Sequence, residues 1–168
     1  MVKLCFIEHR HAPAVQELAS DFAVAEWTRL PHPYPKDGAV NFIEMQILQR
    51  RLGKAFVFAI EAGGQFVGIC GLHEIRDGAS REFGFWLGKP YWGKGYASVA
   101  AESTLEFGFR DLALKRVEAV ALESNHASRR ILEKNGFALI ELAQHNDPHI
   151  HHKDERLAKY ALSVELVL

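Results

Sequence analysis

The sequence predicts a mixed α/β fold, in which one sheet of about seven strands is covered by four or five helices. Short apolar runs typical of strands alternate with segments whose apolar residues recur every three or four positions, as in amphipathic helices. The first strand-like runs follow one another through glycine turns, and the later ones alternate with helices. At 168 residues the chain has the size of one domain, so we assign residues 1–168 to a single domain.

The N-terminal part is predicted to hold one strand and two or three helices. We expect the strand at about Val2–Glu8, and apolar residues at helical spacing within His11–Leu30 predict one or two helices. The proline-rich segment Pro31–Pro35 cannot continue a helix and ends this part. Asp37 is expected to be the N-cap of a further helix that closes near Gly53.

The middle of the chain predicts a three-stranded antiparallel meander. Its strands are expected at Ala55–Ala62, Gln65–Ile75 and Arg81–Leu87. Gly63-Gly64 and Asp77-Gly78 join them, and glycine supplies the positive φ that tight hairpins need.

The last part predicts alternating helices and strands. Gly136 is expected to end the second of these helices, because glycine takes the left-handed position after a helix without penalty. In order, the expected elements are a helix at Tyr96–Asp111, a strand at Arg116–Leu122, a helix at His126–Asn135, a strand at Phe137–Leu142, a polar loop at Gln144–Lys153 and a strand at Leu157–Val167.

Composition limits the environment and the partners. With 20 Lys and Arg against 21 Asp and Glu, the net charge is −1, which indicates no binding to nucleic acid or to an anionic membrane. No apolar run approaches the roughly 20 residues of a membrane span, and the N-terminal apolar run is too short for a signal peptide. Cys5 and Cys70 lie in strand-like runs and are expected to be buried free thiols, so we expect a cytoplasmic protein.

A glycine turn, Trp92-Gly93-Lys94-Gly95-Tyr96-Ala97, joins the third meander strand to the following helix. The first turn of a helix has N–H groups without intrahelical partners and carries partial positive charge, so it binds anions. Glycine lets a phosphate approach the backbone, and Lys94 adds a cation.

Three glycine-loop chemistries compete for this turn. A Walker loop needs Ser or Thr after its lysine, where this chain has Gly95. A dinucleotide fingerprint needs a third glycine, where this chain has Ser98, and an acidic residue about 20 positions on, where Lys115 and Arg116 are basic. The remaining interpretation is a pyrophosphate loop for coenzyme A.

A second motif supports that interpretation. It reads Asn-His-Ala-Ser-Arg-Arg-Ile-Leu-Glu-Lys-Asn-Gly-Phe over Asn125–Phe137. Together, in this order and spacing, the two motifs resemble the GCN5-related N-acetyltransferase (GNAT) superfamily. The resemblance is closest to its ribosomal-protein alanine/serine N-acetyltransferase branch (RimJ/RimL-like) and covers nearly the whole chain, including Pro33-Tyr34-Pro35.

The resemblance implies the acyl-CoA N-acyltransferase fold, with acetyl-CoA as co-substrate and a primary amine as acceptor. The amine would attack the thioester directly in a ternary complex, since no cysteine lies near either motif to form an acyl-enzyme. The acceptor stays open between a protein or peptide N-terminal α-amine, which the branch favours, and a small-molecule amine (amino acid, polyamine or antibiotic).

The resemblance also implies which residues hold the cofactor. Backbone groups of the turn would hold the pyrophosphate, and the strand before it would pair with the pantetheine arm. Asn125 is alternatively a plain N-cap. Arg129 or Arg130 could meet a cofactor phosphate, and the alternative for both is a solvated face. The implied cofactor residues are Phe85, Leu87, Trp92, Gly93, Lys94, Gly95, Tyr96, Ala97, Asn125, Ser128 and Arg129.

Two residues are the candidates for catalysis. Many members of the superfamily carry a tyrosine at the position of Leu132, and in this branch Ser128 is the natural substitute, donating a hydrogen bond to the leaving thiolate. The alternative for Ser128 is a helix serine bonding its own backbone. Glu82 is the expected general base, with His73 and Glu74 as alternatives.

The acceptor side is expected to be formed by Trp27, by Tyr34 and by the loop Gln144–Lys153. That loop holds His145, His149, His151 and His152. A metal site is the alternative, but we expect solvent-facing histidines and no metal.

Two further questions stay open at this point. A non-catalytic acetyl-CoA sensor is the competing function. The protein is expected to be a monomer or a homodimer, and the apolar segment Leu157–Leu168 is suited to pack against a second subunit.

Overall fold

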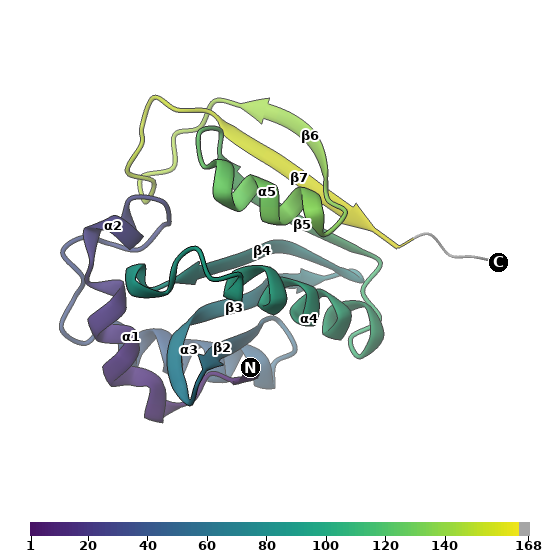
Figure 1. The fold of residues 1–168 in the computed structure, drawn as a ribbon. Helices are drawn as coiled ribbons and strands as arrows, with labels where there is room; N and C mark the ends of the chain where they lie inside the picture. Colours follow the sequence, from purple (N-terminus) through teal and green to yellow (C-terminus); the bar gives the residue numbers. More distant parts are fainter. Residues whose placement is uncertain (165–168) are drawn as a thin grey trace.

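The computed structural model of the protein describes residues 1–164 and contains one seven-stranded sheet, in the order β1-β2-β3-β4-β5-β7-β6 (Figure 1). This confirms the predicted mixed α/β class. The strands are β1 (Val2–Phe6), β2 (Phe56–Ala62), β3 (Gln65–Arg76), β4 (Ala79–Leu87), β5 (Arg116–Leu122), β6 (Ala138–Ala143) and β7 (Leu157–Ser163). The helices are η1 (His9–His11), α1 (Ala12–Ala19), α2 (Phe22–Ala25), α3 (Gly38–Arg51), η2 (Lys89–Tyr91), α4 (Tyr96–Arg110) and α5 (His126–Lys134).

The sheet consists of two antiparallel parts that meet at β4 and β5. Strands β2 to β4 form the predicted three-stranded meander, and β1 extends this part by pairing antiparallel with β2. Strands β5, β7 and β6 form the second part. The two parts join through a short parallel pairing that begins at Ala79↔Arg116 and, within residues 1–164, reaches no further than Phe83↔Ala119. The remainder of β4, residues 84–87, therefore has a backbone edge that β5 does not pair.

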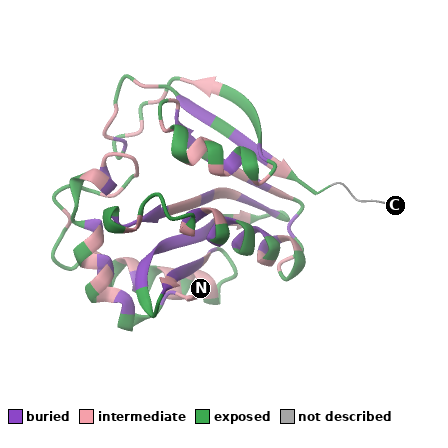
Figure 2. Ribbon diagram, viewed as in Figure 1, coloured by how far each residue is buried: buried purple, intermediate pink, exposed green. Residues whose placement is uncertain are grey.

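Helices cover both faces of the sheet. On one face α4 and α5 pack against inward residues such as Leu72, Phe83 and Val117. On the other face α1 and α3 pack against residues such as Ile69 and Trp86. Figure 2 shows buried residues concentrated along the central strands, whereas the edge strand β6 is mainly exposed or half-buried. None of the helices within residues 1–164 combines the length and apolarity that a bilayer crossing needs.

Some element boundaries differ from the predictions. The segment 11–30 forms two helices, because Asp21 accepts the Ala23 N–H as the N-cap of α2 and so starts a new helix. Asp37 occupies the N-cap position of α3, but its side chain makes no capping hydrogen bond. The predicted last strand is present as Leu157–Ser163, and residues 165–168 of that prediction lie outside the described residues.

Candidate active site

A cleft of about 640 Å³ opens where β4 ends and where α4 and α5 begin. The glycine turn forms one wall and the start of α5 forms the opposite wall, so both sequence motifs meet here. Of the residues predicted to bind a cofactor, those that line the cleft are Phe85, Leu87, Trp92, Gly93, Gly95, Tyr96, Ala97, Asn125 and Ser128.

The glycine turn presents unpaired backbone donors to this cleft. Gly93 (φ +74°) and Gly95 (φ +80°) are in the left-handed region, which glycine adopts without strain. Gly95 is the N-cap of α4, and no side chain among the described residues caps this helix. The first N–H groups of α4 are therefore available to an anion, as a pyrophosphate site requires. The turn is held to β4 by Trp92, whose indole Nε1 donates to the Leu87 carbonyl at 2.8 Å.

The start of α5 forms the opposite wall of the cleft. Asn125 Oδ1 accepts the Ser128 backbone N–H at 3.2 Å, so Asn125 caps the helix. Its amide NH₂ has no partner among the described residues and is available to a ligand. The Ser128 hydroxyl likewise has no recorded partner within residues 1–164, unlike Ser20, whose hydroxyl bonds the Gln16 carbonyl of its own helix.

A second cavity of about 290 Å³ adjoins the cleft. Its floor is one face of β3 and β4, where three residue pairs stand opposite each other in the register. The walls shared by the two cavities are Trp27, Thr28, Phe85, Trp86, Asn125 and Ser128. These register pairs are Ile69↔Trp86, Gly71↔Gly84 and His73↔Glu82, and all of these residues except Gly71 line the cavity.

Charged groups lie at one side of this second cavity. Arg29 donates through Nη1 to Glu82, and its Nε donates to Asp147 Oδ2 at 2.8 Å. The backbone N–H of His149 and the Arg29 guanidinium lower the pKa of Asp147. Burial lowers the pKa of His73, against the opposing influence of Glu82 and Glu74.

Three predicted residues do not line either cavity. Tyr34 packs against Gly38 and the core under α1 and α3, and burial raises its pKa. Lys94 is exposed on the turn. Arg129 points to β7, where Nε donates to the Tyr160 hydroxyl at 2.9 Å and Nη1 to the Glu123 carbonyl at 2.9 Å.

Of the two adjacent arginines that are candidates for a cofactor phosphate, Arg130 lines the large cleft and Arg129 does not. Other residues of the site were missed by sequence reasoning. Arg29 and Asp147 lie 118 residues apart in the chain, so no local pattern links them. Thr28 and Trp86 line both cavities but belong to no motif.

The histidine loop packs against the protein, contrary to the expectation of solvent-facing side chains. His151 Nε2 lies 2.9 Å from the Leu30 carbonyl. His152 stacks on Trp27 with ring centroids 5.1 Å apart, and its Nε2 lies 3.4 Å from Glu26. His149 alone of the four is exposed. The loop is thus tied to the segment Glu26–Leu30 by these contacts and by the Arg29–Asp147 pair.

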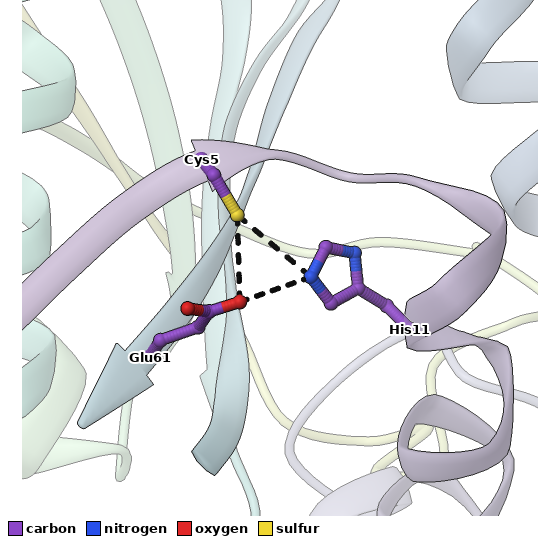
Figure 3. A group of neighbouring side chains, drawn as sticks. All are labelled: Cys5, His11 and Glu61. Carbon is purple, nitrogen blue, oxygen red and sulfur yellow. Dashed lines mark hydrogen bonds and ion pairs between the residues drawn. The ribbon is translucent and has the colours of Figure 1, made fainter. Parts of the chain in front are cut away.

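Another cluster of ligand-type side chains lies at the edge strand β1 (Figure 3). The cluster consists of Cys5, His11 and Glu61, whose ligand atoms all lie within 4.8 Å of one another; no other such group of three is found within residues 1–164. His11 Nε2 lies 3.2 Å from Glu61 Oε1 and 3.7 Å from Cys5 Sγ.

The surroundings of this cluster suit hydrogen bonding better than metal binding. The backbone N–H of Glu8 donates to His11 Nδ1 at 2.9 Å, which places the ring proton on Nε2. Arg10 Nη1 lies 3.2 Å from Glu61, and Arg10 Nη2 donates to Cys5 Sγ at 3.4 Å. A protonated Nε2 has no lone pair for a metal, and a guanidinium already pairs with the carboxylate.

Comparisons with known proteins agree with the fold and with the motifs. Residues 3–138 match the family model described as Acetyltransferase (GNAT) domain. An uncharacterized N-acetyltransferase, p20 of Bacillus licheniformis, is 32% identical over 49% of this chain and 47% of its own length. The putative ribosomal N-acetyltransferase YdaF of Bacillus subtilis is 36% identical over 46% of this chain and 45% of its own length. The chain thus spans about half the length of these curated relatives.

A solved structure covers more of the chain. RimJ of Mycobacterium smegmatis, in complex with a coenzyme A disulfide, superposes with a TM-score of 0.87. The identity is 21%, and the match covers 96% of this chain and 81% of that chain. At this identity the likeness establishes the fold.

Proposed function

Because the chain belongs to the GNAT acetyltransferase family, we propose that it is an acetyl-CoA-dependent N-acetyltransferase that acetylates a primary amine. The observation that carries the proposal is the meeting of two cavities at Phe85, Asn125 and Ser128. One cavity offers an uncapped helix N-terminus, and the other offers an acid–base group beside open space. Such an arrangement brings two substrates together for direct transfer, without an acyl-enzyme.

The large cleft fits coenzyme A. The N–H groups from Gly93 to Ala97 would hold the pyrophosphate, and the unpaired β4 edge at Phe85 and Leu87 would accompany the pantetheine arm. The Asn125 amide is free to donate from the other wall. Of the two adjacent arginines, Arg130 is the one on this wall. When bound, acetyl-CoA supplies an activated acetyl thioester.

Two groups of this chain would stabilise charge during the transfer. A β4 backbone N–H near Phe85 would donate to the thioester oxygen, where negative charge develops. The Ser128 hydroxyl, on the wall between the cavities, would donate a hydrogen bond to the leaving sulfur. Its lack of a partner in the described residues supports this role.

We propose the N-terminal α-amine of a protein or peptide as the acceptor. The name of YdaF, a putative ribosomal N-acetyltransferase, favours a protein acceptor. The second cavity is small, so it suits the end of a chain better than a long side chain. The cytoplasmic location and the monomeric or dimeric state stay predictions.

The test is thiol release from acetyl-CoA in the presence of a panel of amines that includes peptides beginning with Ala and Ser. We expect saturable turnover with the peptides. Ser128→Ala should lower kcat about 10-fold while leaving acetyl-CoA affinity unchanged by calorimetry. Acetyl-CoA binding without turnover on any amine would contradict the enzyme proposal and favour a sensor.

A further inference from the structure

His73 stands on the floor of the second cavity, beside a hollow above Gly84. Its register partner is Glu82, and the neighbouring pair on the same face is Gly71↔Gly84. A Cβ on Gly84 would meet nothing within 4 Å, so open space lies above this residue. The His73 ring folds back over Gly71, where Nε2 lies 3.1 Å from the position a Cβ would take. The ring therefore borders a hollow large enough for a small group.

The two titratable side chains at this hollow, Glu82 and His73, differ in their hydrogen-bond partners. The Glu82 carboxylate receives a hydrogen bond from the Arg29 guanidinium, which is itself anchored to Asp147. Neither ring nitrogen of His73 has a recorded hydrogen-bond partner within residues 1–164. Of these two groups, His73 is the one that lines the cavity with no recorded hydrogen-bond partner on its ring within residues 1–164.

The backbone around His73 is held in an unusual conformation. The next residue, Glu74, has φ 48°, in the left-handed region that non-glycine residues rarely adopt. The fully buried hydroxyl of Ser80 donates to the His73 carbonyl at 2.9 Å and approaches the Glu82 carbonyl at 3.3 Å. Strain of this kind persists where surrounding bonds enforce it, and it is found at functional sites. Ser80 thus fixes the strand segment from which both side chains project.

Burial keeps His73 neutral near pH 7, although two carboxylates face it. Burial lowers its pKa below the usual value, and the Arg29 cation lowers it further. Glu82 on β4 and Glu74 on β3 oppose this shift, and Asp147 faces Arg29 from the histidine loop. A neutral imidazole has one nitrogen able to accept a proton, as a general base requires.

We propose that His73, and not Glu82, takes the proton from the acceptor amine; this inference rests on the proposed function. The acceptor ammonium gives one proton to the free ring nitrogen of His73. The neutral amine then forms a C–N bond to the acetyl carbonyl carbon while the C–S bond breaks. The sulfur leaves with the bonding electron pair and gains the second proton lost by the amine, and the His73 imidazolium returns its proton to water. Glu82 is a positioning residue that faces the imidazolium.

The test compares His73→Gln with Glu82→Gln across a pH series of kcat/KM. Wild type should lose activity as His73 is protonated at low pH. His73→Gln should lower kcat about 100-fold or more and abolish this acid limb. Glu82→Gln should keep the limb and move it to lower pH, because the carboxylate that raises the His73 pKa is gone. Acetyl-CoA affinity by calorimetry should stay unchanged in both variants.

A spectroscopic readout separates proton transfer from a structural role. The imidazole resonances of His73 are followed by NMR against pH in the ligand-free protein, and their midpoint should match the acid limb of the wild-type profile. The limb persisting in His73→Gln, or disappearing only in Glu82→Gln, would overturn the assignment. A wild-type protein that acetylates no amine would instead defeat the proposed function.

Discussion

Two clusters in this molecule contain the same three residue types, histidine, glutamate and arginine, yet the structure uses them differently. At β1, His11 is 3% exposed; Nδ1 accepts from a backbone N–H and Nε2 lies against Glu61. At β3, His73 borders a cavity, and its ring nitrogens have no recorded partner among residues 1–164. Arginine pairs with the glutamate in both places.

The difference indicates that residue type alone does not decide between structure and chemistry. A histidine whose two nitrogens are both occupied ties elements together, here η1 to β1 and β2. A histidine with a free nitrogen beside open space can exchange protons. What separates the two is a backbone donor in one cluster and the open space above Gly84 in the other.

The largest effect is expected from filling the hollow beside His73. Gly84→Leu places a side chain in the space that its missing Cβ leaves open, and should lower kcat/KM for the amine about 100-fold or more. Acetyl-CoA affinity should be unchanged, because Gly84 does not line the large cleft. Gly84→Ala is the matched control and should have a smaller effect. Normal kinetics in Gly84→Leu would mean that the acceptor binds elsewhere.

The next effect is a loss of stability at the cluster of Cys5, His11 and Glu61. His11→Ala removes a buried ring from a hydrogen-bonded network and should lower the free energy of unfolding by about 2 kcal/mol. Thermal denaturation should therefore show Tm lower by about 4–8 °C. We expect kcat/KM of the folded variant to equal that of wild type. A large loss of turnover at full folding would show that this cluster takes part in catalysis.

A smaller effect is expected in the dependence of stability on pH. The folded pKa of His73 lies below its unfolded value, so the unfolded chain binds more protons between the two and stability falls as pH drops below about 6.5. The hydrogen bond from His11 lowers the pKa of Glu61, so its contribution is present above about 4.5 and is lost at lower pH.

Denaturant titrations separate these two windows. His73→Gln should flatten the curve of unfolding free energy in the upper window, and Glu61→Gln should flatten it in the lower one. The opposite pairing of variant and window would contradict the assignment of the shifts.

The smallest effect is expected from zinc. Because Nε2 of His11 carries the proton and Arg10 pairs with Glu61, added zinc should shift Tm by less than about 1 °C. A clear rise in Tm that is absent in Cys5→Ser would instead make the cluster of Figure 3 a metal site.

Local motifs allowed much of the site to be predicted, and long-range pairings did not. The glycine turn and the Asn125–Ser128 cap lie where the sequence placed them, because each is a strand-to-helix or turn-to-helix junction with its own chemistry. The nearness of His73 to the hollow above Gly84 depends on the register between β3 and β4, which no single glycine reveals. Arg29 bonds Glu82, which lies 53 positions later in the chain, and Asp147, which lies 118 positions later.

Rotation about a helix axis also limited the prediction. Adjacent helix residues point about 100° apart, so Arg129 and Arg130 were interchangeable until the orientation of α5 was known. Tyr34 was placed near the acceptor by its proline-rich neighbours, but its ring packs on Gly38.

The early end of the pairing between β4 and β5 leaves the sheet as two halves sharing a short seam. Within residues 1–164, no pairing between β4 and β5 follows Phe83↔Ala119, so we expect the two halves to move relative to each other more easily there. A molecule that lies along the unpaired edge of β4 and contacts the start of α5 would connect the two halves, as an additional strand would. Binding at 100 times the dissociation constant would add about 2.7 kcal/mol to the stability of the folded chain. The folded protein would then be most rigid with this molecule bound, and amide hydrogen exchange would slow both at the end of β4 and at the start of α5.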